Sequence, residues 1–137
     1  MSDELLGGCY CGDVRYRATG PVQLRAQCHC RTCQHIAGGG PNYFMLIRPD
    51  SFEYTAGTPA TFTRPDLENA VTREFCGNCG THLTSLRPGL DAVVLKVGTL
   101  DDPALFDAPA IAIFAEDKQP FHLLPGIPVF DQLPPKR

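Results

Sequence analysis

Seven cysteines, grouped tightly along the chain, constrain this sequence more than any other feature. They fall into one group of three and two close pairs: Cys28, Cys30 and Cys33; Cys9 and Cys11; Cys76 and Cys79. An odd number of thiols cannot all form disulfides within one chain, and a Cys-x-Cys spacing is too short for an easy bridge. Clustered cysteines are then typical of metal ligands or redox centres in a reducing compartment, so we expect a cytoplasmic protein.

The composition is typical of a globular chain with a sizeable core. At 137 residues, 43% hydrophobic and 20% charged, we expect a single domain over residues 1–137, with a core from about 7 to 130 and a loose, proline-rich end at 131–137. The net charge of −3 disfavours nucleic-acid binding. No run approaches the ~20 apolar residues of a membrane span, and the acidic start is unlike a secretory signal. We therefore expect neither nucleic-acid nor membrane partners.

Short strands dominate the pattern of hydrophobic residues. Alternation of apolar and polar side chains, or short apolar runs bounded by glycine and proline, predicts strands at residues 14–18, 22–28, 42–47, 52–54, 60–63, 71–75, 81–85, 92–97 and 111–114. One short helix is expected at 31–37, ended by the glycines at 38–40. We also expect a tight turn at 7–12, a single helical turn at 101–106 and an extended strap from residue 125. The fold class is therefore all-β, or β-dominated.

The two cysteine pairs predict a closed zinc site. Zinc prefers four ligands in a tetrahedron with Zn–S near ~2.3 Å, and glycine-flanked turns let the backbone aim two sulfurs at one point. Cys9, Cys11, Cys76 and Cys79 would clamp the N-terminal turn onto a hairpin. The binding energy, on the order of 10 kcal/mol, would also be folding energy. The alternatives are that one pair is redox-active or merely buried, and the sequence leaves open which pair joins which.

The remaining three cysteines would leave a second metal one ligand short. Cys28, Cys30 and Cys33 can place three thiolates on one ion from a single turn and helix. Three protein ligands with an exchangeable fourth position are typical of catalytic zinc. Three thiolates more than neutralise the ion, so the site suits an external thiol better than the activation of water. We therefore predict two zinc ions per chain, the second of them catalytic.

Other interpretations of the three-cysteine group remain open. His35, two residues beyond Cys33, could complete the tetrahedron and make the site structural. His29 is a poorer candidate because it lies between two ligands on one tight turn. The group could instead form a redox disulfide with one spare thiol, or be a cluster of buried cysteines without metal.

These motifs resemble the glutathione-dependent formaldehyde-activating enzymes, which share the zinc-binding fold of Mss4-like proteins. The similarity spans about residues 7 to 130 and includes all seven cysteines in order. The matching segments are Gly7–Tyr16, Cys28–Cys33, Phe75–Thr81, Val97–Pro103 and Glu116–Phe121. The sequence differs from the family at Ala110–Phe114. A histidine and a tryptophan are frequent in this segment of the family, whereas here it reads Ala-Ile-Ala-Ile-Phe and the whole chain has no Trp.

The resemblance implies small packed antiparallel sheets with one short helix, stapled by zinc. It implies a structural zinc on Cys9, Cys11, Cys76 and Cys79, and a catalytic zinc on Cys28, Cys30 and Cys33. The implied activity is that of a carbon–sulfur lyase that forms or cleaves a thiol–aldehyde adduct such as S-(hydroxymethyl)glutathione. The implied partners are glutathione or another small thiol and an aldehyde. A non-enzymatic Mss4-like module that binds a partner protein is the alternative.

Several residues could assist such a reaction. A nearby acid or base would carry the alkoxide proton, and His35, His82 and Glu116 are candidates. Glutathione carries two carboxylates, for which Arg31, Arg48 and Arg73 are candidate cations. The sequence does not favour one member of either set.

Overall fold

The computed structural model describes residues 4–135, and within them strands predominate. The single α-helix, α1, spans Arg31–Ala37. The strands are β1 (Leu5–Gly8), β2 (Arg15–Ala18), β3 (Leu24–Cys28), β4 (Asn42–Ile47), β5 (Phe52–Ala56), β6 (Ala60–Thr63), β7 (Thr72–Phe75), β8 (His82–Leu86), β9 (Val93–Lys96) and β10 (Ile111–Ile113). The predicted β-dominated fold is confirmed.

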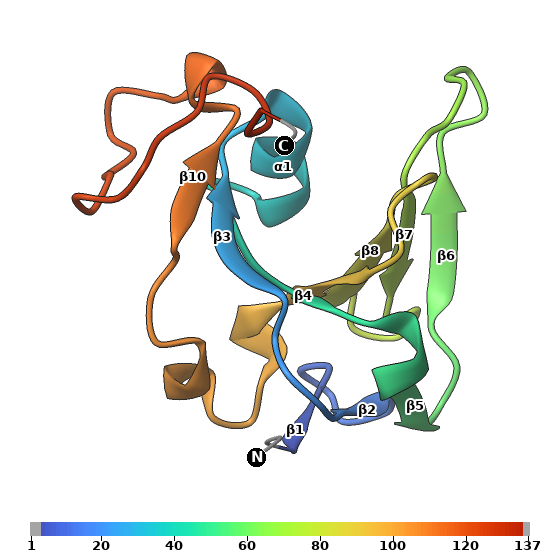
Figure 1. Cartoon of the computed structure of the whole chain (residues 1–137). Helices are drawn as coiled ribbons and strands as arrows, with labels where there is room; N and C mark the ends of the chain where they lie inside the picture. Colours follow the sequence, from blue (N-terminus) through green and yellow to red (C-terminus); the bar gives the residue numbers. More distant parts are fainter. Residues whose placement is uncertain (1–3, 136–137) are drawn as a thin grey trace.

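The strands form two sheets. A seven-stranded sheet has the order β10-β3-β4-β9-β8-β7-β6, and a three-stranded sheet has the order β1-β2-β5. The large sheet bends so that β10, β3 and α1 stand opposite β7 and β6, with the small sheet at the closed end (Figure 1). All pairs are antiparallel except β10 on β3. The expectation of purely antiparallel sheets is wrong there, because the long connection before β10 allows the crossover that a parallel pair needs.

The two faces of the large sheet bury different sets of side chains. Side chains alternate along a strand, so Met45 and Ile47 of β4 point to one face and Asn42 and Phe44 to the other. Met45 and Ile47 join the main core, which contains Tyr16 of the small sheet. On the other face, Phe44 belongs to a second cluster with Ala26, Cys28, Cys33 and Ile113. The concave side of the bend is therefore the side that carries the three-cysteine group.

The N-terminal segment is a strand before it becomes a turn. Sequence reasoning placed a tight turn over residues 7–12, but Gly7 and Gly8 belong to β1. A Cβ on Gly7 would lie 2.3 Å from the hydroxyl oxygen of Tyr16, so this glycine is required by close packing across the sheet. Gly12, with φ +87°, occupies the turn itself.

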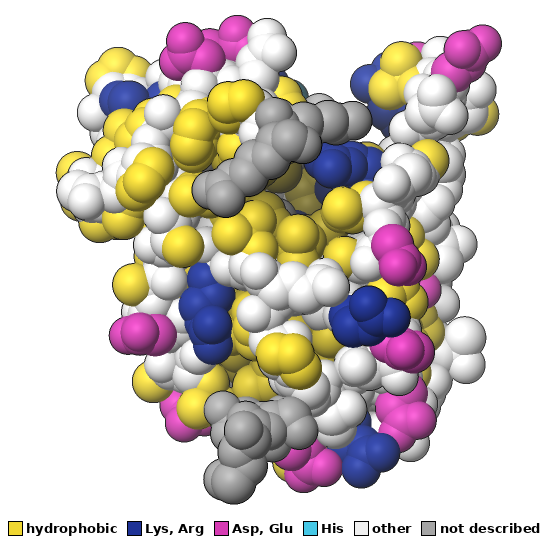
Figure 2. Space-filling model, viewed as in Figure 1, with side chains coloured by type: hydrophobic (Ala, Val, Ile, Leu, Met, Phe, Trp, Pro, Cys, Tyr) yellow, Lys and Arg dark blue, Asp and Glu magenta, His cyan; other side chains and the backbone are white. Residues whose placement is uncertain are grey.

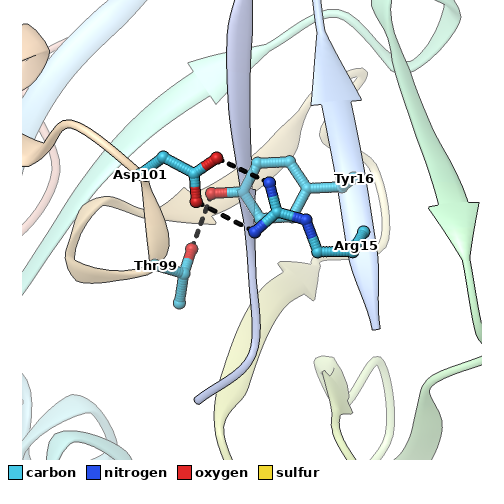
Figure 3. A network of polar contacts seen from close by, with 4 residues as sticks. All are labelled: Arg15, Tyr16, Thr99 and Asp101. Atoms are coloured by element: carbon cyan, nitrogen blue, oxygen red, sulfur yellow. Dashed lines mark hydrogen bonds and ion pairs between the residues drawn. The ribbon is translucent and has the colours of Figure 1, made fainter. Parts of the chain in front are cut away.

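Two polar contacts fasten β2 to the segment that follows β9 (Figure 3). Arg15 and Asp101 form a two-pronged ion pair, at 2.9 and 2.5 Å. The hydroxyl of Thr99 donates to the carbonyl of Lys96 at 2.6 Å. Its oxygen, 2.7 Å from that of Tyr16, therefore accepts the tyrosine proton. Burial raises the pKa of Tyr16 to about 12, so the phenol stays protonated.

The predicted C-terminal strap lies along β10. The amide of Phe130 donates to the carbonyl of Ala112 at 2.9 Å, and the amide of Ala115 donates to the carbonyl of Phe130 at 3.0 Å. The tip predicted to be loose, 131–137, extends beyond the described residues. The single helical turn expected near residues 101–106 is the 3₁₀ turn η3 (Pro103–Phe106). Within residues 4–135, every helix is too short or too polar to cross a membrane.

Candidate functional site

The fold brings the two cysteine pairs together into a four-sulfur cluster. The sulfurs of Cys9, Cys11, Cys76 and Cys79 all lie within 4.8 Å of one another. The first pair lies in the turn between β1 and β2, and the second in the turn between β7 and β8. The second turn closes through a bond from the Gly80 amide to the Cys76 carbonyl at 2.8 Å. Two turns 65 residues apart are thus joined at one point.

The geometry and surroundings of this cluster fit a tetrahedral metal. A Zn–S distance of ~2.3 Å implies sulfur–sulfur separations of about 3.8 Å. Cys9 and Cys11 are 3.6 Å apart, and Cys11 and Cys76 are 3.8 Å apart. Amide groups donate to the sulfurs, namely the Val14 amide to Cys9 at 3.2 Å and the Asn78 side chain to Cys11 at 3.3 Å. Such donors stabilise negatively charged sulfur, so this cluster could hold a metal ion.

The other three cysteines converge where β3 passes into α1. Cys28 is the last residue of β3, Cys30 is the N-cap of α1 and Cys33 lies in the first turn of the helix. The Cys30 sulfur accepts the Cys33 amide at 3.3 Å, which makes it a capping group as well as a candidate ligand. All three sulfurs lie within 4.8 Å of one another. We call this group the trio.

Within the described residues, no fourth His, Cys, Asp or Glu ligand atom joins the trio. His35, the expected competitor, lies on the exposed side of α1 and lines a different depression, together with Arg31 and Gln34. The trio therefore has three protein sulfurs as its candidate ligands.

His29, although it stands between two cysteines of the trio, faces a buried network instead. Its Nδ1 lies 3.0 Å from His122 Nδ1, and its Nε2 lies 2.9 Å from the side-chain nitrogen of Gln27. The Gln119 amide donates to His122 Nδ1, which must then be an acceptor. His29 therefore donates from Nδ1 and accepts the Gln27 proton at Nε2. Burial lowers the pKa of His29, in agreement with this neutral form.

The sulfurs of the trio share protons in a way that suits metal binding. Hydrogen bonds from Cys28 and Cys33 lower the pKa of Cys30 below its ordinary value. The hydrogen bond that Cys28 makes to Cys30 raises the pKa of Cys28 above its ordinary value. One thiolate is thus already favoured without metal, and a cation would displace the remaining protons.

A cleft of about 440 Å³ opens above the trio. α1 and β10 form one wall, and the β6–β7 hairpin forms the other. The space-filling view shows a hollow between these walls, with apolar side chains on its floor and Lys or Arg side chains near it (Figure 2). Large apolar side chains from both walls and from β4 between them line the cleft: Ile36, Phe44, Phe62, Leu67, Val71 and Phe114. The trio therefore lies in a largely apolar cleft.

Two cations share the concave face with the trio. In the register of the sheet, Lys96 of β9 stands opposite Phe44, and Arg73 of β7 stands opposite Ser85. Lys96 donates to the Asn42 side-chain oxygen at 2.9 Å, and Arg73 donates to the Ser85 hydroxyl at 3.0 Å. Burial lowers the pKa of Lys96 to about 8, against the opposing effect of the negative sulfurs. Both positive charges therefore lie on the same face of the sheet as the sulfurs of the trio.

Sequence reasoning missed Lys96 and gave Arg73 no preference over other arginines. The available signal was a lysine at the end of an otherwise apolar strand, but the sequence alone could not show which face it occupied. Arg48 pairs instead with Asp50 on the surface. None of the three candidate acids or bases lines the cleft: His35, His82 and Glu116.

Comparisons with known proteins agree on the family. A sequence model of the family described as "Glutathione-dependent formaldehyde-activating enzyme" matches residues 4–117. A Halomonas elongata protein named "Putative glutathione-dependent formaldehyde-activating enzyme" is 30% identical over 92 residues, which cover 61% of this chain. The matched region spans 57% of that relative, so less than two thirds of its length.

A solved structure supports the fold. The crystal structure of a Rhodobacter sphaeroides protein aligns with a TM-score of 0.55 at 18% sequence identity. The alignment covers 70% of this chain and 87% of that one. At this level of identity, the similarity extends to the fold alone.

Proposed function

We propose that this chain, which belongs to the glutathione-dependent formaldehyde-activating enzyme family, is a zinc-dependent carbon–sulfur lyase acting on a thiol–aldehyde adduct. S-(hydroxymethyl)glutathione is the adduct that the family description suggests. The observation that carries the proposal is the trio: three sulfurs, without a fourth His, Cys, Asp or Glu in the described part of the chain, at a cleft of about 440 Å³.

The two clusters take different roles in this proposal. Cys9, Cys11, Cys76 and Cys79 would hold a structural zinc, because four sulfurs within 4.8 Å of one another are the number of ligands that a closed zinc site needs. Cys28, Cys30 and Cys33 would hold the catalytic zinc. A zinc ion there would supply Lewis acidity, which lowers the cost of ionising a substrate thiol at neutral pH.

The reaction balances without an oxidant or reductant. In the forward direction a bond forms between the thiol sulfur and the carbonyl carbon, and the C=O π bond breaks. The thiol proton ends on the former carbonyl oxygen, which gives an S-hydroxyalkyl adduct. The reverse direction returns the proton and releases the aldehyde. The chain therefore has to bind the thiol, orient it and limit access of water.

The residues of the cleft suit these tasks. With a thiol bound between them, the apolar walls would limit the access of water to the reacting atoms, which strengthens electrostatic interactions there. Lys96 and Arg73 place positive charge on the same face as the trio, where negative charge on sulfur and oxygen has to be stabilised. The Lys96 ammonium is oriented by Asn42, and the Arg73 guanidinium by Ser85.

The test is to measure thiol–aldehyde exchange directly. Zinc-loaded protein is mixed with glutathione and formaldehyde, and NMR exchange spectroscopy follows the interconversion of the free thiol and its hydroxymethyl adduct. We expect the wild-type protein to accelerate exchange above the spontaneous rate. Cys30→Ser should abolish the acceleration, whereas His35→Ala, a substitution on the exposed side of the same helix, should preserve it.

Two results would count against the enzyme. Acceleration that survives Cys30→Ser would remove the trio from the reaction. If protein that carries both metals fails to accelerate the exchange of every thiol tested, a non-enzymatic zinc module would be favoured.

Two further parts of the proposal rest on indirect support. We place the protein in the cytoplasm, because thiols reserved for metal need a reducing compartment. We also propose that the chain folds as one domain, because the four-sulfur cluster joins its N-terminal turn to the β7–β8 hairpin.

A further inference from the structure

We propose that the cleft selects a thiol that carries both a carboxylate and an apolar group, with Arg73 as the partner of the carboxylate. This inference rests on the proposed function, since it names the substrate class of the same site. It differs from the family description in favouring a less polar thiol than glutathione.

Arg73 has a fixed position and, among the described residues, forms no ion pair with a carboxylate. Its Nη1 donates to the Ser85 hydroxyl at 3.0 Å, which orients the guanidinium on the concave face. The ion pairs among the described residues engage Arg15, Arg17, Arg48 and Arg64, but not Arg73. The adjacent carboxylate of Glu74 faces the opposite side of β7 and accepts hydrogen bonds from Tyr54 and Thr84, at 2.9 and 2.6 Å. A half-buried cation without a carboxylate partner is costly unless an anion reaches it.

The other charged groups along the cleft do not replace Arg73. Arg64 is paired with Asp66 through two contacts, at 2.9 and 2.5 Å, and both side chains are on the exposed hairpin loop. Arg87 and Glu68 also line the cleft, but both are exposed and opposite in sign. Arg73 is therefore the cation best placed to bind a substrate anion inside the cleft.

The walls of the cleft favour an apolar body for the same ligand. Phe62 and Leu67 of the β6–β7 hairpin line the cleft and yet are 53% and 52% exposed. Phe114 and Ile36 line the cleft from the wall that carries the trio. A ligand with a hydrocarbon group would remove this surface from water, at about 25 cal/mol per Å².

Glutathione matches these walls less well. It has two carboxylates, an ammonium group and two peptide bonds, and each would need a partner when desolvated. The side chains of Asn42 and Ser85, two of the polar groups along the cleft, are already engaged by Lys96 and Arg73. A compact mercapto acid with one carboxylate and one hydrocarbon group leaves fewer polar groups unpaired.

The experiment compares four thiols on the cobalt-loaded protein. Coordination of a thiol changes the visible absorption of cobalt, and a titration gives a dissociation constant for each compound. The compounds are 2-mercapto-3-phenylpropanoate, its primary amide, 3-mercaptopropionate and glutathione. We expect the phenyl acid to bind tightest, about 10–100-fold tighter than its amide because the amide loses a charged hydrogen bond.

Three variants locate the two halves of the ligand. Arg73→Met should remove the preference for the acid over the amide, while Arg48→Met, in a surface pair with Asp50, should leave the preference intact. Phe62→Ser, at an exposed position of the edge strand β6, should weaken the binding of the phenyl acid but not the binding of 3-mercaptopropionate. Because the acid–amide comparison on the wild-type protein needs no substitution, it remains decisive if a variant fails to fold.

The outcomes separate this inference from the function on which it rests. If thiols change the cobalt spectrum but glutathione binds as tightly as the phenyl acid, the substrate class is wrong and the proposed function stands. The same conclusion follows if Arg73→Met preserves the acid–amide preference. If no thiol changes the spectrum of protein with cobalt in both sites, the proposed function fails together with the inference.

Discussion

The two cysteine clusters of this protein are built from the same side chain in two different arrangements. In the four-sulfur cluster, two turns from distant parts of the chain meet, and their four sulfurs lie within 4.8 Å of one another. In the trio, three sulfurs come from one continuous segment, and all three cysteines line a cleft. The number of converging segments, more than the type of residue, distinguishes a candidate structural site from a candidate reactive one.

The two clusters also differ in the groups that surround their sulfurs. The four-sulfur cluster receives local amide donors, including the Val14 amide and the Asn78 side chain. The trio also receives amide donors, such as the Cys33 amide to Cys30, but two cations lie on the same sheet face, Lys96 and Arg73. Amide donors stabilise a fixed set of thiolates, whereas oriented cationic side chains can also stabilise charge that develops during a reaction.

The largest expected effect comes from removing one sulfur from each cluster. Cys76→Ser should cost about 5 kcal/mol or more of unfolding free energy, because the energy of a structural zinc is folding energy. Cys30→Ser should lower the zinc content from two per chain to one and cost less unfolding free energy than Cys76→Ser, because the trio joins no distant segments of the chain. Denaturant unfolding and elemental analysis measure both quantities. Equal destabilisation by the two substitutions would remove the distinction between the clusters.

A smaller effect is expected behind the trio. His122→Ala should cost about 1–3 kcal/mol, because it leaves the buried Nδ1–H of His29 without its acceptor. It should also weaken metal binding by the trio, while the four-sulfur cluster keeps its metal. His35→Ala is the matched control and should change neither the stability nor the metal content. Loss of the second metal in the His35 variant would instead identify His35 as a ligand.

The amide donors of the four-sulfur cluster can be tested separately. Asn78→Ala removes the side chain that donates to Cys11 at 3.3 Å. We expect a loss of about tenfold in zinc affinity at this cluster, as is typical when a hydrogen bond to a ligand is removed. Competition with a coloured chelator measures it. An unchanged affinity would show that the donor contributes nothing to the difference between the clusters.

The smallest effect concerns the ion pair that holds the strand after the N-terminal turn. Asp101→Asn should cost about 0.2–1 kcal/mol at neutral pH, since the side chains of Arg15 and Asp101 are 36% and 52% exposed. The hydrogen bond from Arg15 lowers the pKa of Asp101 below its ordinary value of 3.8. The stabilisation is therefore present above that pH and is lost as the pH falls through the lower, folded-state value.

Urea unfolding at a series of pH values checks this prediction. The wild-type protein and the Asp101→Asn variant should differ at pH 7 and converge in strong acid. A difference that grows with acidity would contradict the assigned sign.

Local sequence patterns were enough to predict most of the fold. Alternation predicted β2, and the apolar run at residues 42–47 predicted β4 with its observed bounds. The glycine after Ala37 predicted the end of α1, where Gly38 adopts φ +79°. Each of these features depends on neighbours within a few residues, so the local sequence was enough to predict it.

Features that depend on distant segments could not be predicted in this way. Strand β1 was missed because its two glycines suggest a turn, whereas Gly7 is required by the approach of Tyr16 from β2. The parallel pairing of β10 with β3 depends on the path of a long connection. The position of Lys96 beside the trio depends on the register of β9 against β4.

Anomalous X-ray diffraction at the zinc edge, from crystals of protein purified with zinc, tests the central claim most directly. We predict two peaks per chain, one surrounded by Cys9, Cys11, Cys76 and Cys79, and one bound by Cys28, Cys30 and Cys33 with a fourth ligand from solvent or an added thiol. A fourth protein side chain on the second zinc, or a disulfide within the trio, would contradict the account.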